Sequence, residues 1–425
     1  MATTAGLPLQ KTLAPASIGE VAEMVRLAGK QGTALYPIGG QTAQQLGLTP
    51  RREGWGLSMT QLNRVVDYPA RDMTITVEAG ITLDALAKTL ATERQRLPID
   101  VPFPERATLG GVVATNASGP RRYGCGTIRD YVIGISAVDG RGVAFKGGGR
   151  VVKNVAGYDF CKLLTGSFGT LAVITQVTLK VKPIPEASAF LAIDLPQSSD
   201  PAHDTVEPYL AALVNSAVTP TAIELLTGPA WRDDSALGPI PSETSTRLLV
   251  GLEGTKVEVD WMLDTLAREW EGHAGWIAAG RPRPRRVAEG ETTGLWQRLT
   301  RFAVEGESPL VIEAGLPPSR VVPFVREIRV IDPQASIQSH AGDGVVIVRF
   351  ANFTADDISK VLVGQLQSLA GQAGGHVVVL RKGIEGAWTR RAVWDIPGAA
   401  LAAMQAVKSQ FDPLGILNPD RFVYA

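Results

Sequence analysis

Two glycine-rich stretches in the first third of the chain have the composition of phosphate-binding loops. They are PIGGQTAQQLG at residues 37–47 and ERATLGGVVATNASGPRRYG at residues 105–124, each beside a run of β-branched residues. Glycine lets a chain present consecutive backbone N–H groups at close range, so two such loops predict a pyrophosphate bound by both. A pyrophosphate in turn predicts a dinucleotide cofactor, and the order of the loops favours a flavin over a nicotinamide.

Other nucleotide-binding motifs are missing from the sequence. A Rossmann fingerprint requires G-x-G-x-x-G opening a helix after the first strand. Gly124-Cys-Gly126 lacks the third glycine, and no Walker A pattern occurs. The glycines at residues 147–149 precede Arg150 and are predicted to form a hairpin turn instead.

Length and composition limit the classes of protein to consider. A chain of 425 residues predicts two domains, and 45% hydrophobic with 20% charged residues is typical of a globular protein. Lys+Arg and Asp+Glu both number 42, so no net basic field would attract nucleic acid. No apolar run approaches the roughly 20 residues of a membrane span, and the N-terminal residues lack a signal-peptide pattern. These features predict a cytoplasmic protein.

The cysteine count restricts electron transfer. Cys125 and Cys161 are the only two cysteines, and both are expected to be structural, buried thiols. An iron–sulfur cluster usually needs about four thiolate ligands, so this chain cannot hold one unaided. Electrons taken up by a flavin would therefore leave to oxygen, to a diffusible acceptor or to another subunit.

The elements of the first region alternate between helices and strands, which predicts an α/β arrangement around the loops. Helices are expected over residues 18–31 and 82–93, with Ser17 and Thr82 as N-caps. Strands are expected over residues 33–37, 65–68, 73–78, 131–139 and 171–182. Two prolines within residues 183–188 place a domain boundary there.

The second region predicts a different, α+β arrangement. Strands are expected over residues 190–195, 222–227, 247–253, 310–314, 344–350 and 376–380, and helices over residues 205–215, 257–271, 319–330 and 356–373. This alternation of strands and helices favours a ferredoxin-like domain, with enough elements for a doubled unit. The turn-rich tail FDPLGILNPDRF, residues 411–422, is expected to dock at a defined place.

Several of these segments resemble the vanillyl-alcohol-oxidase-type flavoproteins, also named for p-cresol methylhydroxylase. The resemblance is carried by PIGGQTAQQLG, ATLGGVVATNASGPRRYGCGTIRDYVIG and FDPLGILNPDRF. Within that family, SGPRRYGCGTIRDYVIG followed by VVKNVAGYDFCKLLTGSFGTLAVITQVTLKV is similar to the E subunit of bacterial glycolate oxidase. The resemblance implies an α+β fold: a two-part FAD-binding domain over 10–185, a ferredoxin-like cap (substrate) domain over 186–395, and a C-terminal segment, 396–425, that packs back on the FAD domain.

Matched position by position, the resemblance implies which residues bind FAD. Cofactor contact is favoured over a plain turn for the glycine pairs at 39–40 and 110–111, whereas both interpretations hold equally for Gly119 and Gly169. The implied cofactor-binding residues are Pro37, Gly39, Gly40, Gln41, Thr42, Thr108, Gly110, Gly111, Thr115, Asn116, Gly119, Ile128, Asp130, Val132, Gly169 and Ile174.

The distribution of histidines predicts how the flavin is attached. His203, His273, His340 and His376 all follow residue 202. Covalent attachment in this family often uses a histidine of the flavin domain, and this chain has none there. The FAD is therefore expected to be non-covalent.

Candidate catalytic residues are few. Oxidising a 2-hydroxy acid requires a cation for the carboxylate and a base for the hydroxyl proton. The family's D subunit type has a metal-binding H-x-G-D-G-N-x-H stretch; here His340 and Asp343 remain, but Val345 and Ile347 replace the asparagine and the second histidine, so no metal is expected. A lone histidine at a strand edge is more often structural.

Arginines supply the candidate cations. Arg390 and Arg391 follow Trp388 in a loop-like stretch, which suits anion binding or subunit contact; solvated surface charge explains them equally well. Further candidates for a substrate clamp are Arg349, Arg381 and Lys382.

The resemblance finally implies a function and partners. It predicts an FAD-binding subunit of a glycolate oxidase complex, oxidising glycolate or D-lactate, with a D-type flavoprotein subunit and an iron–sulfur F-type subunit as partners. The complex would be cytoplasmic or peripheral to the inner membrane through those partners. Two alternatives stay open: a free-standing FAD-dependent oxidoreductase of a small hydroxy acid or alcohol, and a non-catalytic flavin-binding scaffold.

Overall fold

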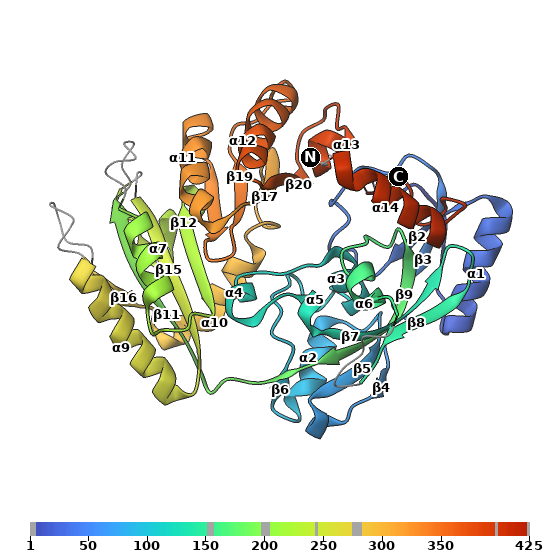
Figure 1. The fold of residues 1–425 in the computed structure, drawn as a ribbon, viewed down its shortest axis with the longest axis horizontal. Coiled ribbons are helices and arrows are strands. Elements are labelled where there is room, and N and C mark those ends of the chain that lie inside the picture. Colours follow the sequence, from blue (N-terminus) through green and yellow to red (C-terminus); the bar gives the residue numbers. More distant parts are fainter. Residues whose placement is uncertain are drawn as a thin grey trace. The chain divides into compact units, whose positions relative to one another are not determined.

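The chain forms two compact units (Figure 1). The computed structural model describes residues 6–150, 157–196, 205–242, 245–273, 283–395 and 398–422. Unit 1 comprises Met1–Ser118, Gly126–Ile184 and Thr389–Ala425, and unit 2 comprises Gly119–Cys125 and Pro185–Trp388. The first part of the KNVAGYD block, residues 153–156, and His203 lie outside the described residues.

Unit 1 begins with a small parallel sheet covered by helix α1. The sheet has the order β1-β3-β2, formed by β1 (Leu9–Leu13), β3 (Gly54–Ser58) and β2 (Ala34–Ile38). Helix α1 (Ile18–Gln31) has the predicted bounds, and the Ser17 side chain accepts a hydrogen bond from the Glu20 N–H as its N-cap. Its apolar face packs against the sheet through Val21 and Val25. Strand β2 therefore leads directly from this core into the first glycine loop.

The second sheet of unit 1 is antiparallel and holds the second loop. Its order is β4-β5-β9-β7-β8, with bounds β4 (Val65–Asp67), β5 (Thr74–Glu78), β9 (Ala172–Lys180), β7 (Val132–Asp139) and β8 (Ala144–Gly148). The associated helices are α2 (Leu83–Ala91), α3 (Leu109–Thr115), α5 (Ile128–Tyr131) and α6 (Phe160–Leu164). The predicted turn at residues 147–149 is wrong: Gly147 and Gly148 lie in β8, and the hairpin turns earlier, where the Gly142 N–H donates to the Asp139 carbonyl.

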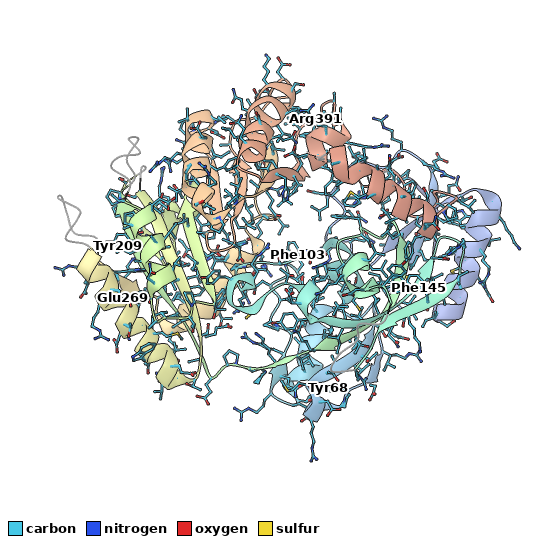
Figure 2. All side chains as sticks on the ribbon, in the orientation of Figure 1. Tyr68, Phe103, Phe145, Tyr209, Glu269 and Arg391 are labelled. Atoms are coloured by element: carbon cyan, nitrogen blue, oxygen red, sulfur yellow. The ribbon has the colours of Figure 1, made fainter. Side chains whose placement is uncertain are left out.

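The C-terminal residues complete unit 1. Helices α13 (Arg390–Trp394) and α14 (Gly398–Phe411) lead into the tail. Phe411 packs near Phe145, labelled in Figure 2, with ring centroids 5.7 Å apart. The tail then runs parallel to β2, because the Leu35 N–H donates to the Ile416 carbonyl at 2.7 Å and the Asn418 N–H donates to the Leu35 carbonyl at 2.9 Å. Strand β2 thus lies between β3 and a partner from the other end of the chain.

A buried ion pair between Lys408 and Asp412 holds this tail in place. Removing its cation is expected to destabilise unit 1. Lys408 Nζ lies 2.6 Å from Asp412 Oδ2 and donates to the carbonyls of Thr170 at 2.7 Å and Leu417 at 3.1 Å. The Asp412 side chain is fully buried. Lys408→Met would leave that carboxylate buried without its cation, which costs about 3 kcal/mol of unfolding free energy.

The measurement is the urea midpoint of the Lys408→Met chain. Lys360→Met is the matched control, because Lys360 meets Asp356 only on the surface, where such a pair contributes little. Equal midpoints for the two variants would contradict the stabilising role of the buried pair.

Unit 2 is one eight-stranded antiparallel sheet built from two ferredoxin-like halves, as the doubled arrangement predicted. Its order is β16-β11-β15-β12-β18-β19-β17-β20. The first half contains β11 (Ala187–Pro196), α7 (Glu207–Asn215), β12 (Ala222–Thr227), β15 (Ser245–Gly254), α9 (Lys256–His273) and β16 (Arg285–Arg286). The second contains β17 (Leu310–Gly315), α11 (Val321–Ile331), β18 (Ser336–His340), β19 (Val345–Phe350), a π-helix (Ile358–Leu366) continuing as α12 (Gln367–Gln372), and β20 (His376–Lys382).

The two halves join where β12 pairs with β18, and the two faces of the sheet differ. Helix α10 (Glu289–Arg301) covers one face through an apolar cluster that includes Trp296, Phe190 and Val345. Helix α9 packs on β11 and β15, and its Trp270 meets Tyr209 of α7, labelled in Figure 2, with ring centroids 6.2 Å apart. Because strand side chains alternate between faces, the residues that share a face with Val345 can be identified from the register.

Short elements complete the fold. They are η1 (Ala70–Asp72), β6 (Gln95–Arg96), α4 (Arg122–Cys125), β10 (Lys182–Pro183), α8 (Pro229–Arg232), β13 (Asp233–Asp234), β14 (Gly238–Pro239) and η4 (Pro318–Arg320). Across the described residues, the helices are too short or too polar to span a lipid bilayer.

Candidate functional site

The two glycine loops meet in unit 1, closely enough that only glycine fits at the contact. A Cβ atom on Gly39 would lie 2.0 Å from Thr108 Oγ1, and one on Gly40 would lie 1.6 Å from the carbonyl oxygen of Arg106. Gln41 follows with a left-handed backbone (φ 60°). The first loop therefore turns with its backbone directly against the second, which is the arrangement that the glycine pattern predicted.

The second loop is held in place by backbone hydrogen bonds to the segment that follows β5. The Leu109 and Gly110 N–H groups donate to the carbonyls of Ile81 and Ala79, at 2.9 and 2.7 Å. The Thr108 hydroxyl accepts the N–H of Gly111 at 3.4 Å as the N-cap of α3. These contacts fix the loop without using the amides of Gly39 and Gly40.

A third turn and the C-terminal tail adjoin the loops. Phe168 and Gly169 have left-handed backbones; the Phe168 N–H donates to the Ala114 carbonyl, and its carbonyl accepts from Asn418 Nδ2 at 2.6 Å. A Cβ on Gly169 would lie 3.7 Å from Pro37. The first glycine loop (loop 1), helix α3 of the second glycine loop (loop 2), this turn and the tail are thus in contact with one another.

Unsatisfied polar atoms mark the same region as a ligand site. Asn116 Oδ1 and Ser167 Oγ are buried and find no hydrogen-bond partner among the described residues. A buried polar atom without a partner costs free energy, so these atoms fit a polar ligand that supplies the partner. Together with the cradle at Gly39 and Gly40, which a Cβ would fill, they fit the pyrophosphate and polar groups of FAD.

The other expected cofactor residues do not lie at the contact between the two glycine loops. Ile128, Val132 and Ile174 are buried members of the unit 1 core, so their side chains pack there, and Val132 and Ile174 also pair in the sheet. The Asp130 carboxylate accepts from the Thr127 N–H at 2.9 Å, and this hydrogen bond lowers its pKa; it is a helix cap. The remaining positions are as follows: Gly119 belongs to unit 2, Thr115 Oγ1 donates to the Gly111 carbonyl, and Thr42 is half-buried in loop 1.

In unit 2, the candidate His340 lies against a buried carboxylate that the sequence analysis missed. Glu224 on β12 and His340 on β18 are cross-strand partners, with His340 Nδ1 2.7 Å from Glu224 Oε1. Both side chains are buried, and Gln338 Nε2 donates to the other Glu224 oxygen at 2.8 Å. Burial opposes the charged imidazole, but the charge of Glu224 and its hydrogen bond outweigh burial and raise the pKa of His340. An isolated acid inside the apolar run AIELLT was the available signal.

Asp343 and an arginine complete this cluster. The Asp343 N–H donates to the His340 carbonyl in the turn after β18, and Asp343 Oδ2 lies 3.8 Å from Arg122 Nε. Burial raises the pKa of Asp343, against the positive charges of Arg122 and His340. Tyr123 packs on Gly342, where a Cβ would lie 2.4 Å from its ring. The Glu224–His340–Asp343–Arg122 cluster therefore unites a base, acids and a cation.

The remaining candidates lie apart from this cluster. Arg390 and Arg391 are on α13 of unit 1, where Figure 2 labels Arg391. Within the described residues, no group of three or more His, Cys, Asp or Glu side chains could hold a metal ion. Cys161 is buried, which raises its pKa to about 11, whereas Cys125 is only half-buried, so the expectation of two buried thiols is wrong for Cys125.

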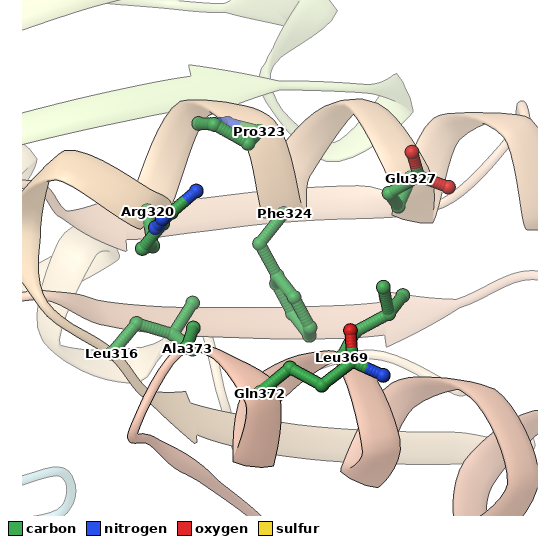
Figure 3. Close-up of a pocket in the computed structure, with 8 residues that line it drawn as sticks. All are labelled: Leu316, Arg320, Pro323, Phe324, Glu327, Leu369, Gln372 and Ala373. Carbon is green, nitrogen blue, oxygen red and sulfur yellow. The ribbon is translucent and has the colours of Figure 1, made fainter.

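A pocket of about 300 Å³ opens elsewhere in unit 2, between α11 and the end of α12. Figure 3 shows Phe324 directed from α11 towards Leu369 and Gln372, with Arg320 and Glu327 at the helix surface. None of its lining residues belongs to the cofactor loops or to the cluster around His340, so this pocket is not part of the candidate site.

Comparisons with protein families match both ends of the chain. The family described as FAD binding domain matches residues 9–148, which contain both glycine loops. The family described as FAD linked oxidases, C-terminal domain, matches residues 382–422, which contain α13, α14 and the tail. Most of both matched segments lies in unit 1.

Individual relatives are similar over most of their length. Glycolate oxidase subunit GlcD of Bacillus subtilis is 27% identical over 429 residues, which cover 96% of this chain and 88% of that protein. Glycolate oxidase subunit GlcE of Escherichia coli is 27% identical over 363 residues, 84% of each protein. Among solved structures, alkyldihydroxyacetonephosphate synthase matches with a TM-score of 0.65 and 20% identity, over 96% of this chain and 76% of that one; this likeness shows the fold.

Proposed function

We propose that this chain, an FAD-dependent oxidoreductase whose two ends match families of FAD-linked oxidases, oxidises a small 2-hydroxy acid, glycolate or D-lactate, to the 2-oxo acid. We propose further that it does so as the FAD-binding E-type subunit of a glycolate oxidase complex. The observation that carries the substrate class is the Glu224–His340–Asp343–Arg122 cluster, which offers both groups that hydroxy-acid oxidation requires.

The proposed roles follow from the chemistry of each side chain. A carboxylate only accepts hydrogen bonds, so the contact with Glu224 places the proton of neutral His340 on Nδ1 and leaves Nε2 free to accept a proton. His340 would take the hydroxyl proton of the substrate, and Arg122 would pair with its carboxylate. Bound FAD supplies the acceptor for two electrons.

Unit 1 would hold FAD non-covalently through loop 1 and loop 2. Gly39, Gly40 and Gly110 allow the backbone to approach a pyrophosphate, and Asn116 offers an acceptor oxygen to a polar group of the cofactor. The described part of unit 1 carries no histidine, which leaves no histidyl group there for a covalent link.

Electron exit supports the subunit role. The chain has two cysteines, too few for an iron–sulfur cluster of its own. Relatives at 27% identity include both a D and an E subunit, so identity alone does not separate them. The E-type role rests on the loss of metal ligands at Val345 and Ile347, and the proposed partners are a D-type flavoprotein and an iron–sulfur subunit.

The test compares a single reduction with turnover. Purified alone and mixed anaerobically with glycolate or D-lactate, the chain is expected to have its flavin reduced once, and repeated turnover is expected only after the partner subunits are added. Sustained turnover with oxygen and no partner would favour the free-standing oxidoreductase. No flavin reduction by either acid, with or without partners, would favour the scaffold role.

A further inference from the structure

Among the residues that the structure describes, a pair of arginines in unit 2 has no carboxylate within ion-pair distance, unlike several neighbouring arginines. Arg349 on β19 and Arg381 on β20 both pair in register with Val311 of β17, so they flank that strand on the same face of the sheet. Both are half-buried. Arg349 lies over the ring of Phe302 at 5.3 Å and against the backbone of Gly306.

The hydrogen-bonding capacity of this pair is largely unused. Arg349 Nε and Arg381 Nε and Nη2 are buried and have no hydrogen-bond partner among the described residues. Arg381 Nη1 donates to the Val304 carbonyl at 3.1 Å. The acid that acts on Arg349 is Glu305, an exposed residue that ion-pairs with Arg301 at 3.4 Å.

Other arginines of unit 2 show what a satisfied guanidinium looks like in this fold. Arg247 meets both oxygens of Asp194, at 2.6 and 3.0 Å. Arg298 meets Asp234 at 2.7 Å, and Arg121 meets Glu253 at 2.8 Å. Two adjacent guanidiniums with buried, unused donors therefore need an explanation.

The charges of Arg349 and Arg381 also favour an anionic ligand. Burial lowers the pKa of both arginines, and the charge of Arg349 lowers that of Arg381 further. An oxyanion placed against both side chains would accept the unused N–H groups and offset the like charges, since guanidinium binds carboxylate and phosphate oxygens in a planar, bidentate way.

We propose that Arg349 and Arg381 form a binding site for a small, doubly charged oxyanion, such as phosphate, sulfate or oxalate. The site is separate from the cluster around His340. His340 pairs with Val345, and Arg349 follows four residues later on β19, about 13 Å further along the strand. A two-carbon hydroxy acid cannot reach both places.

The experiment titrates the FAD-loaded full chain with inorganic phosphate by calorimetry, at constant ionic strength set with sodium chloride. FAD-loaded protein is used so that the cofactor loops do not take up phosphate. Phosphate is expected to bind the wild type, and Arg381→Gln is expected to weaken binding roughly tenfold or more. Sulfate and oxalate titrations then distinguish tetrahedral from planar dianions.

The matched control is Arg268→Gln, an exposed arginine of α9 whose guanidinium hydrogen-bonds to Asp264 and Thr265 of the same helix. It is expected to bind phosphate like the wild type. If Arg381→Gln folds poorly, Arg381→Lys keeps the charge and is expected to weaken phosphate binding through the lost bidentate geometry. A wild type that responds to phosphate no more than to chloride overturns the proposal, as does equal phosphate affinity in wild type and both Arg381 variants.

Discussion

Gly40→Ala is expected to abolish most FAD binding while leaving unit 2 intact. The new Cβ would lie 1.6 Å from the Arg106 carbonyl oxygen, a backbone atom that cannot rotate away. Loop 1 and loop 2 must therefore separate, and overpacking of this kind costs about 2–3 kcal/mol. If that cost falls on the bound state, FAD affinity decreases roughly 30- to 150-fold. The measurement is the dissociation constant of FAD, from flavin fluorescence.

A control in the same unit separates the clash from a general effect of alanine. Gly19→Ala lies in α1, where the nearest atom to its Cβ would be Ser17 Oγ at 3.8 Å. Alanine is a better helix former than glycine, so this variant should bind FAD normally and unfold no earlier than wild type. FAD affinity unchanged in Gly40→Ala would mean that the contact between the loops is not needed for the cofactor.

His340→Gln is expected to lower the rate of flavin reduction by substrate about 100- to 10,000-fold, the range that a general base contributes. FAD content should stay at the wild-type level, because His340 lies in unit 2, whereas the glycine pairs at 39–40 and 110–111 lie in unit 1. Anaerobic stopped-flow absorbance with glycolate measures the rate. His376→Gln is the matched control: it makes the same change in the same unit, at an exposed residue of β20.

The pH dependence gives a second readout of the same group. The pKa of His340 is raised above its ordinary value by Glu224, and a base must be neutral to accept a proton. The reduction rate should therefore be low at pH 6 and rise as the pH increases through that raised pKa. Glu224→Gln removes the charge, so it should shift the rising limb to lower pH. An identical profile in Glu224→Gln would show that the carboxylate does not act on His340.

Stability should change with pH in the opposite direction. A raised pKa in the folded state means that the native protein binds the proton more tightly than the unfolded chain. The contribution of the Glu224–His340 pair is thus fully present below the unfolded pKa of histidine, about 6.5, and is lost as the pH rises through the folded value. Activity and this part of the stability therefore favour different ends of the same pH range.

Local sequence signals predicted much of the fold. The α+β class with a flavin-binding domain of the vanillyl-alcohol-oxidase type is confirmed by the family matches and by the likeness in fold to the solved structure of alkyldihydroxyacetonephosphate synthase. Helix α1 and strand β12 have the predicted bounds because capping and apolar periodicity define them locally. The glycine loops were recognisable because a close backbone approach leaves only glycine.

The elements that escaped prediction depend on contacts from elsewhere. Strand β18 carries the sequence SIQSH, whose polar residues are all buried between β12 and β19. Helix α10 contains two glycines and three threonines and is held by packing on the sheet. The partnership of Glu224 with His340 spans 116 positions of sequence, so no local pattern could reveal it.

The parallel contact between β2 and the tail has a consequence for biosynthesis. Residues that flank the first glycine loop leave the ribosome long before their neighbours around Ile416 and Asn418, which lie far later in the sequence. A nascent chain can therefore form strands and helices of unit 1 before the tail emerges, but β2 gains its second partner only when the tail has been made. We expect stable flavin loading to follow synthesis of the tail, so a chain without residues 411–422 should fail to retain FAD.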